Sequence, residues 1–234
     1  MKKLKLNLRA GLCLLVLWGM FNTLSAQNYL INETFDNFPQ NLNGTSYNSW
    51  TATSISGDTA VDRWVFDNYV GYDVTSPLSG QVALADGYNG GFANSGSNTT
   101  NAHNLALTSP TVSTVGLTNL TLTYDELYLQ LSASFIYVEV STDGGSNWTT
   151  VFSTGTGGFF PVSRSISLNS YTGNASFKVR FRWTKPASTT HGYWMLDNVK
   201  LFSRYANDVG VESVVSPINN SCPDANQALS IKVT

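Results

Sequence analysis

Four carboxylates have the surroundings of a metal site. Glu33, Asp36, Asp86 and Asp197 each stand at or beside the end of an expected strand, with Gly or Asn nearby. Calcium takes six to eight oxygens from carboxylates, amides and backbone carbonyls, which suits a place where strand ends meet loops. The pattern therefore predicts a structural calcium ion held by these residues. It is equally typical of solvated edge carboxylates and turn formers.

Three aromatic residues lie in two polar stretches that are expected to be long loops. Trp50 stands within residues 36–62, and Tyr88 and Phe92 stand within residues 87–101. Long ordered loops on a rigid scaffold often hold binding residues. We therefore predict that these three rings bind a ligand, either a glycan or a protein surface. The alternative is that the rings only fasten the loops to the core.

The sequence lacks a recognisable catalytic set. Neither His103 nor His191 belongs to an HExxH motif, and there is no nucleophile elbow, phosphate loop or dinucleotide fingerprint. Asp125 and Glu126 are adjacent carboxylates, but neighbours on a strand point to opposite faces and cannot cooperate directly. We therefore predict no enzymatic activity for this chain. A catalytic triad assembled from distant residues is the alternative.

Residues 141–148, STDGGSNW, form the sharpest local motif. They resemble the Asp-box of sialidase propellers, but a propeller needs the unit at every blade and this chain has one copy. Asp143 is placed to accept backbone N–H groups, the glycines to adopt positive φ, and Trp148 to pack over the bend. The motif therefore predicts a structural hairpin turn.

The charge balance argues against nucleic acid as a partner. The chain has 13 Lys and Arg against 15 Asp and Glu. Four of the basic residues lie in residues 1–26, which leaves nine against fifteen, a net charge of about −6. Nucleic-acid binding instead needs clustered Lys and Arg. One basic cluster follows one face of an expected strand, which we interpret as solvated, or as a surface for an anionic glycan or acidic partner: Lys178, Arg180, Arg182 and Lys185.

The first 26 residues have the features of an export signal. A basic start precedes an apolar run from Ala10 to Phe21 and a small-residue cleavage site, Leu24-Ser25-Ala26. The run is about 12 residues long, whereas a membrane-spanning helix needs roughly 20. We therefore predict cleavage, a secreted or cell-surface protein, and no membrane insertion of the mature chain. Cys222 is then the one cysteine left, which suggests a partner outside this sequence.

Strands and turns are expected to make up residues 27–205. No window keeps a 3.6-residue apolar period for three turns, and Gly, Ser, Thr and Asn are frequent. Residues 176–184 alternate apolar and basic side chains, as in an antiparallel strand with one buried face. The pattern predicts an all-β, jelly-roll β-sandwich. Its expected strands are Tyr29–Phe35, Arg63–Phe66, Gln81–Ala85, Asn104–Thr108, Leu117–Leu131, Phe135–Ser141, Trp148–Ser153, Ser163–Leu168, Ser176–Thr184 and Tyr193–Phe202.

Residues 29–202 also resemble a known family. The matching segments are Glu33-Thr34-Phe35-Asp36, Gly80–Leu84, Leu105–Pro110, Leu120–Tyr124, Val138–Gly145 and Trp194–Val199. They resemble the MAM-like jelly-roll modules of exported Bacteroidota proteins, including gingipain cleaved-adhesin domains and the domains called choice-of-anchor J. The resemblance implies an adhesion, binding or accessory module without activity of its own. The family's closing strand often has two acidic residues, whereas this chain has Asp197-Asn198, so the implied calcium site has one charge fewer.

Residues 206–234 carry a second resemblance. From Asn207-Asp208-Val209-Gly210-Val211 to Ile231–Thr234 they resemble the first two strands of a CARDB-type immunoglobulin-like domain. Such a domain needs about 80–100 residues. We therefore expect an incomplete immunoglobulin-like β segment, and a chain that is the N-terminal part of a longer protein. The expected organisation is a signal peptide in 1–26, a jelly-roll module in 27–205 and this truncated domain in 206–234.

Two classes of function follow from these observations. The first is a secreted, non-catalytic module for adhesion or for carbohydrate or protein binding. The second is an accessory domain that brings a secreted hydrolase, a protease or glycosidase, to its substrate. The sequence beyond residue 234 distinguishes the two, because further β-modules favour adhesion and a hydrolase motif favours the accessory role.

Overall fold

The chain divides into two compact units, residues 28–204 and a second unit of residues 1–27 and 205–234. The structure is a computed structural model. It describes residues 28–37, 46–56, 64–66, 72–86, 102–130, 133–187, 192–205, 211–216 and 230–233, so the expected export signal and Cys222 lie outside the described residues. Within these ranges no helix has the length and apolar character needed to cross a membrane.

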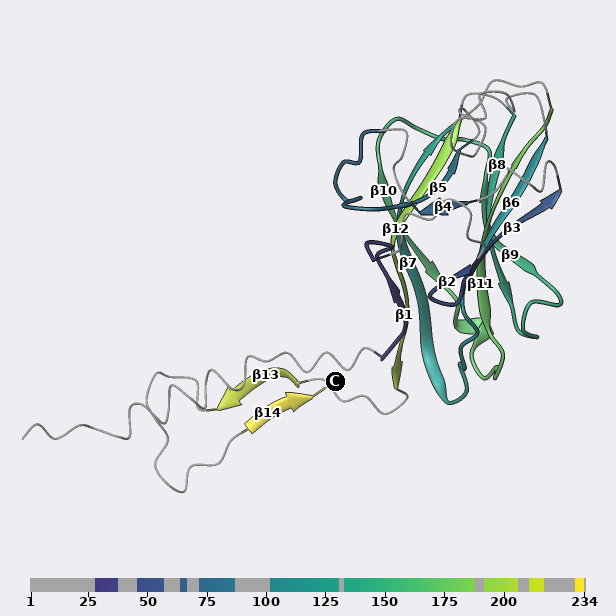
Figure 1. The fold of residues 1–234 in the computed structure, drawn as a ribbon. Coiled ribbons are helices and arrows are strands. Elements are labelled where there is room, and N and C mark those ends of the chain that lie inside the picture. The colour runs from purple at the N-terminus through teal and green to yellow at the C-terminus, as the bar shows by residue number, and fades with distance from the viewer. Residues whose placement is uncertain are drawn as a thin grey trace, which may run out of the picture. The chain divides into compact units, whose positions relative to one another are not determined.

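The larger unit is a sandwich of two six-stranded sheets that lie face to face (Figure 1). We call sheet A the strands in the order β10-β7-β12-β5-β4, with β1 also pairing with β12, and sheet B the order β2-β3-β6-β11-β8-β9. Sheet A comprises β1 (Asn28–Glu33), β4 (Val65–Phe66), β5 (Ala83–Asp86), β7 (Leu117–Leu129), β10 (Val162–Ser167) and β12 (Tyr193–Tyr205). Sheet B comprises β2 (Ser46–Tyr47), β3 (Trp50–Ser56), β6 (His103–Thr108), β8 (Phe135–Ser141), β9 (Thr149–Thr154) and β11 (Lys178–Lys185). The one helical element in the described ranges is a 3-10 turn, Asn169–Tyr171. The all-β prediction is confirmed.

Strand β11 shows how the side-chain pattern builds the core. Val179, Phe181 and Trp183 are completely buried between the sheets, while alternate residues face outward and are half-buried. Strands β6 and β8 flank β11 on either side in antiparallel register. A central strand with one buried face therefore explains the alternation that the sequence shows.

Strand β3 corrects the expectation of an unbroken loop over residues 36–62. Residues 51–56 of β3 pair with β6, with Thr51 opposite Thr108 and Ala52 opposite Leu107. The strand was missed because its inward face offers only Trp50 and Ala52 as buried apolar residues, and the rest is Thr, Ser and one exposed Ile. Pairing with β6 outweighs this weak local pattern.

A second apolar cluster covers part of the outer face of sheet A. The segment over residues 72–82 supplies Leu78 and Val82, which pack on residues of β4, β5, β7 and β12. This segment therefore closes the outside of sheet A near the β5 and β12 pairing. The packed residues are Val65, Leu84, Leu127 and Met195, with Tyr72, Val74 and Tyr193 partly buried around them.

The smaller unit contains an antiparallel strand pair among its described residues. Strand β13 (Val211–Ser216) pairs with β14 (Ser230–Val233), with Val211 opposite Val233 and Val214 opposite Ile231. The assignment of this segment to an immunoglobulin-like domain of the CARDB type stays a prediction.

Candidate functional site

Asp197 and Asn198 both face outward because β12 bulges at this point. Leu196 before them and Val199 after them are buried in the core, and Asn198 has a φ of 51°. Strand β12 also changes partner here, from β5 at Leu196 to β1 at Val199. An extra residue in one strand has this effect, and it places two polar side chains together on the outer face of sheet A.

The segment over residues 77–81 hydrogen-bonds to the side chains of this bulge. Asp197 Oδ2 accepts the Ser79 N–H at 2.9 Å, and Asn198 Nδ2 donates to the Pro77 carbonyl at 3.3 Å. Asn198 Nδ2 also donates to Asp125 Oδ2 at 2.9 Å. Asp36 Oδ1 accepts the Gln81 N–H at 3.1 Å. Carboxylates therefore hold the segment onto the sheet.

Gly80 is required at the centre of this contact. Its φ is +60°, a conformation that side chains rarely adopt, and a Cβ at this position would overlap Asp36 Oδ1. With a glycine at position 80, the backbone of the segment approaches the Asp36 carboxylate more closely than it could with a side chain at that position.

Burial and neighbouring carboxylates raise the proton affinity of Asp197 and Glu33. Burial raises the pKa of Asp197 to about 6, and the nearby Asp36 and Asp125 carboxylates add to this, against hydrogen bonds from the Ser79 and Asn198 backbone. Burial also raises the pKa of Glu33, with Asp36 adding to it and the Phe35 and Thr34 N–H groups opposing it. This region therefore carries charge repulsion that protons or a cation would relieve.

The structure places Asp36 near two of the other predicted metal ligands and the fourth ligand elsewhere. The Asp36 carboxylate acts on both Asp197 and Glu33, whereas Asp86 pairs with Tyr193, four residues along β12 from Asp197 and about 13 Å away at the rise of a strand. Asp86 Oδ1 accepts a hydrogen bond from the Tyr72 hydroxyl at 3.2 Å. Across the described ranges, no group of three or more His, Cys, Asp or Glu side chains is arranged to hold a metal ion. Calcium binding stays a prediction, with Asp86 outside the region concerned.

Trp50 does not contribute to a binding surface, which corrects the sequence prediction. Its ring is 1% exposed and packs between Phe35, at 5.7 Å, and Phe181, at 6.4 Å, in the core. Its position on the inward face of β3 accounts for this. Tyr88 and Phe92, the other two predicted ligand-binding residues, lie outside the described residues.

Other aromatic residues reach solvent at one end of the sandwich, which we call the loop end. There β5 and β7 finish and β12 begins: Asp86 lies opposite Tyr193, and the Gly158 N–H donates to the Tyr128 carbonyl at 2.8 Å. Next to Gly158, Phe159 is 77% exposed and Phe160 is 83% exposed. The sequence signal was a pair of large apolar residues directly after two glycines.

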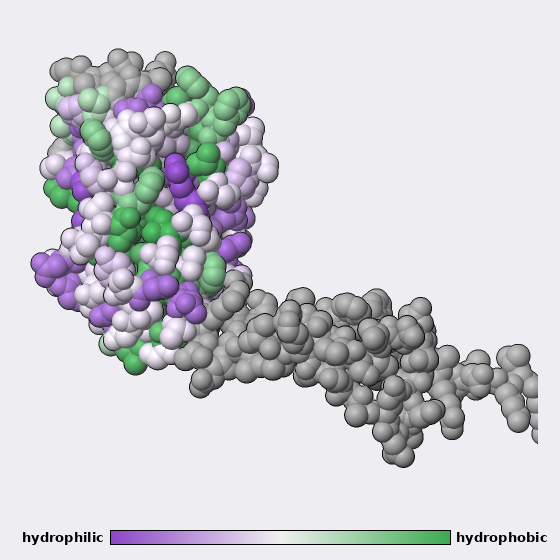
Figure 2. All heavy atoms as spheres, turned by 180° about the vertical axis from the view of Figure 1, so that it is seen from behind, coloured by the Kyte–Doolittle hydropathy of each residue, from purple (hydrophilic) through white to green (hydrophobic). Residues whose placement is uncertain are grey.

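A third exposed ring connects this end to sheet B. Phe135 opens β8 and is 46% exposed, and its ring lies against Gly155 of the loop that carries Phe159 and Phe160. Apolar side chains, in green, also reach the surface toward the upper end of the sandwich in the view from behind (Figure 2). These exposed rings form a candidate contact surface, because exposed apolar patches are a feature of interaction sites.

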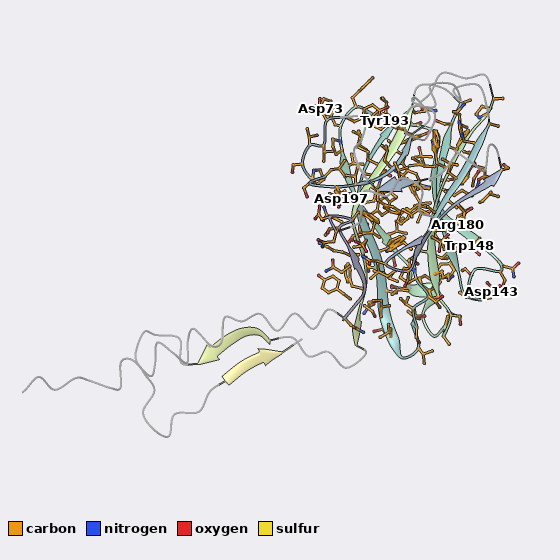
Figure 3. The ribbon with its side chains drawn as sticks, viewed as in Figure 1. Asp73, Asp143, Trp148, Arg180, Tyr193 and Asp197 are labelled. Atoms are coloured by element: carbon orange, nitrogen blue, oxygen red, sulfur yellow. The ribbon has the colours of Figure 1, made fainter. Side chains whose placement is uncertain are left out.

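The outer face of sheet B carries alternating rings and charges, which we call the stripe: Tyr137, Glu139, Trp148, Arg180 and Arg182. The Arg180 guanidinium lies 4.1 Å from the centre of the Trp148 ring, and that of Arg182 lies 4.0 Å from the centre of the Tyr137 ring. Figure 3 shows Arg180 and Trp148 together on the β11 side of the sandwich, with Asp197 on the β12 side. Arg180 and Arg182 of the predicted basic face are therefore ordered rather than freely solvated. Lys185 does not share this face, because it lies an odd number of positions from the others along the strand and is buried on the same side of β11 as Trp183.

The turn at residues 141–148 has the predicted structural role. Asp143 Oδ1 accepts N–H groups from Ser146, at 3.0 Å, and Asn147, at 2.9 Å, and Gly144 and Gly145 have positive φ. The Trp148 indole N–H donates to the Gly145 carbonyl at 3.0 Å. The turn thereby fixes the Trp148 ring at the end of the stripe.

The predicted separation of Asp125 and Glu126 is also confirmed. Asp125 faces outward toward Ser163, whereas Glu126 is buried and accepts hydrogen bonds from Arg164 at 2.7 Å and from the Trp194 indole at 2.8 Å. Burial raises the pKa of Glu126, against the opposing effects of Arg164 and Trp194.

The two histidines are not brought into a common described site. His103 is buried and stacks on Trp183 at 5.9 Å, and His191 lies outside the described residues. The prediction that the chain has no enzymatic activity therefore stays a prediction.

No family model and no curated protein matches this sequence. Among solved structures, the K3 cleaved adhesin domain of Lys-gingipain from Porphyromonas gingivalis is similar with a TM-score of 0.53 and 18% identity, over 75% of this chain and 98% of that domain. The K1 cleaved adhesin domain of the same protein has a TM-score of 0.51 and 17% identity, over 73% and 96%. A CBM61 module in complex with β-1,4-galactotriose has a TM-score of 0.47 and 15% identity, over 76% and 99%, which is too distant to support an argument. The chain therefore has the jelly-roll fold of the cleaved adhesin domains.

Proposed function

We propose that this chain is an exported, non-catalytic module that binds an extracellular glycan. The observation that carries the proposal is the pair Phe159 and Phe160, which stand almost fully exposed at the loop end of a rigid sandwich. Exposing two phenylalanines costs hydrophobic free energy that a purely structural loop would recover by burying them. Their flat apolar faces suit the faces of sugar rings.

The neighbouring rings extend this surface. Phe135 lies next to the same loop, and the Phe135 and Tyr137 ring centres are 6.4 Å apart along the outer face of β8. Tyr88 and Phe92, predicted from the sequence as ligand-binding residues, lie outside the described residues and stay a prediction. Aromatic groups on fixed strands bind a ligand with little loss of conformational entropy, which favours recognition of an extended ligand.

The accessory role remains a second proposal. A module that binds glycan serves equally well to hold a secreted protease or glycosidase near its substrate, and the sequence beyond residue 234 distinguishes the two. In both roles we propose that the mature chain acts at the cell surface or as a secreted protein.

A glycan array probed with the mature chain, residues 27–234, tests the binding proposal. We expect selective binding that falls at least tenfold in the double variant Phe159→Ala/Phe160→Ala. The matched control is Val115→Ala, an equally simple truncation of an apolar residue that is 60% exposed just before β7 begins, at the opposite end of that strand. Equal binding by all three proteins would place the ligand elsewhere, and binding to no glycan would refute the proposed function.

A further inference from the structure

Two guanidinium groups share a single carboxylate in the stripe on sheet B. Arg180 donates from Nε to Glu139 Oε2 at 2.7 Å, and Arg182 donates from Nη2 to Glu139 Oε1 at 2.8 Å. Burial raises the pKa of Glu139, but the hydrogen bonds and charges of Arg182 and Arg180 outweigh burial and hold the pKa below its ordinary value. Glu139 is therefore ionised at neutral pH, and one positive charge of the pair is left uncompensated.

Each of the two arginines has hydrogen-bond donors that Glu139 does not use. The bonds to Glu139 use Nε and Nη2, and within the described part of the chain the Nη1 groups of Arg180 and Arg182 have no hydrogen-bond partner. The two side chains are 16% and 18% exposed, and Glu139 is 6% exposed. The carboxylate therefore lies beneath two guanidiniums that still reach water.

The surroundings of the pair increase its positive charge. Lys178 is the next outward residue of β11, opposite Ser141. Asp143, beyond Trp148, uses its carboxylate oxygens on Ser141, Ser146 and Asn147 of its own turn. The stripe is therefore a cationic area on a chain whose net charge is negative.

The strands beside the stripe carry small residues next to the two arginines. In the register of sheet B, Arg180 lies beside Thr108 and Thr51, and Arg182 lies beside Ala106 and Thr53. These neighbours are small, whereas the aromatic rings stand on the other side, on β8 and in the turn before β9. The arginines thus stand between rings that offer apolar faces and hydroxyl groups that can hydrogen-bond to a sugar.

From this arrangement we infer that the stripe binds an acidic glycan, one that bears carboxylate or sulfate groups. The inference rests on the proposed glycan-binding function and adds the chemical class of the ligand. The Nη1 groups of Arg180 and Arg182 donate to the anionic group, and the rings of Tyr137 and Trp148 contact the sugar. Charge-assisted bonds from a preorganised guanidinium are strong and directional, whereas an ammonium gives only a point charge. Continuity with Phe135 and the exposed loop favours a glycan over an acidic protein.

The Glu139 carboxylate neutralises part of the positive charge of Arg180 and Arg182, so removing its charge should strengthen the attraction of an anionic ligand. The assay is affinity electrophoresis of the mature chain in gels that contain polygalacturonate or its methyl ester, two polymers that differ only in charge. We expect retardation by polygalacturonate alone, weakened by salt as charge attraction is screened. Glu139→Gln should tighten this binding, and Arg182→Lys, which keeps the charge but loses the planar fork, should weaken it about tenfold, or about 1.4 kcal/mol. Lys200→Gln, on sheet A, is the matched charge control and should behave as the unaltered chain.

Each other outcome is informative. Equal retardation by the two polymers, or no retardation by polygalacturonate while the array finds a neutral glycan, would overturn the acidic class and leave the proposed function intact. Equal retardation by poly-glutamate would favour an acidic protein and overturn the inference. The melting temperature of every variant must match that of the unaltered chain within a few degrees. Misfolding would weaken binding in both variants, whereas we expect Glu139→Gln to strengthen it and Arg182→Lys to weaken it.

Discussion

At the scale of single residues, the positions of the carboxylates, more than their number, determine whether they can share a metal site. The sequence indicated four acidic residues at strand ends, and the structure places one of them, Asp36, near both Asp197 and Glu33. The fourth, Asp86, lies opposite Tyr193, farther along β12, which strand ends alone do not reveal. Asn198 hydrogen-bonds to Asp125 and Pro77 because the bulge turns its side chain outward. No periodic pattern in the sequence predicts this bulge.

Asp197 should make stability depend on pH. Its pKa is raised to about 6 in the folded state, against an ordinary value of 3.8 for an unfolded chain, so the folded chain binds the proton more tightly. The stabilisation is complete below the unfolded pKa and is lost as the pH rises through the folded one. We expect the free energy of unfolding without calcium to be higher at pH 4.5 than at pH 7.5 by on the order of 1–2 kcal/mol. Urea denaturation at both pH values measures it, and a difference that persists in Asp197→Asn would assign the effect to other groups.

Calcium should also stabilise the fold through these carboxylates, in competition with protons. We propose that Asp36 and Asp197 take part in binding a structural calcium ion, whose charge would relieve their repulsion. The melting temperature should then rise with added calcium and fall with chelator. At a hundredfold excess over Kd, the bound ion should raise the free energy of unfolding by about 2.7 kcal/mol. The gain should shrink at pH 4.5, where protons compete. Identical melts with calcium and chelator at pH 7.5 would remove the site.

At the scale of elements, strands with strong alternation were predictable and weak ones were not. Strand β11 follows directly from its apolar and basic alternation, and the 141–148 turn follows from its Asp, Gly and Trp. Strand β3 did not, because it relies on pairing with β6 rather than on its own residues. The sequence predicted the basic residues of the stripe. It did not predict that Tyr137 and Trp148 lie against them, because those contacts depend on the pairing of β8, β9 and β11.

The segment that covers sheet A depends on one glycine. Gly80→Ala should lower the free energy of unfolding by on the order of 1–3 kcal/mol, because it strains a positive-φ position and drives a Cβ into Asp36. The matched control is Gly116→Ala, whose φ is +76° but whose Cβ would meet no atom within 4 Å. Urea denaturation should therefore show the larger loss for Gly80→Ala. Equal losses would mean that the approach to Asp36 contributes nothing.

At the scale of the whole molecule, the two units differ in what they can bury. Residues 28–204 enclose a core between two sheets, whereas the described part of the second unit is a single strand pair, and isolated pairs are marginal in water. A fragment of residues 27–205 should therefore melt cooperatively at the same temperature as the mature chain. In hydrogen exchange, β13 and β14 of the mature chain should exchange quickly. Strong protection of both strands in a monomer would contradict this.

The fold was thus predictable, whereas the surface that we propose for binding was not. Strand periodicity indicates a jelly-roll sandwich, but the exposure of Phe159 and Phe160 depends on how a single loop joins β9 to β10. Trp50 shows the same limit in reverse, because an aromatic residue in a polar stretch lies in the core.

We propose that the module binds glycan through the aromatic loop end and leaves the glycan intact. Hydrogen exchange of the mature chain, with and without the best glycan from the array, tests this most directly, with the glycan recovered afterwards and analysed by mass spectrometry. We predict slower exchange in residues 155–162 and at the start of β8, and a glycan of unchanged mass. Protection confined to other strands, or a cleaved glycan, would contradict the account.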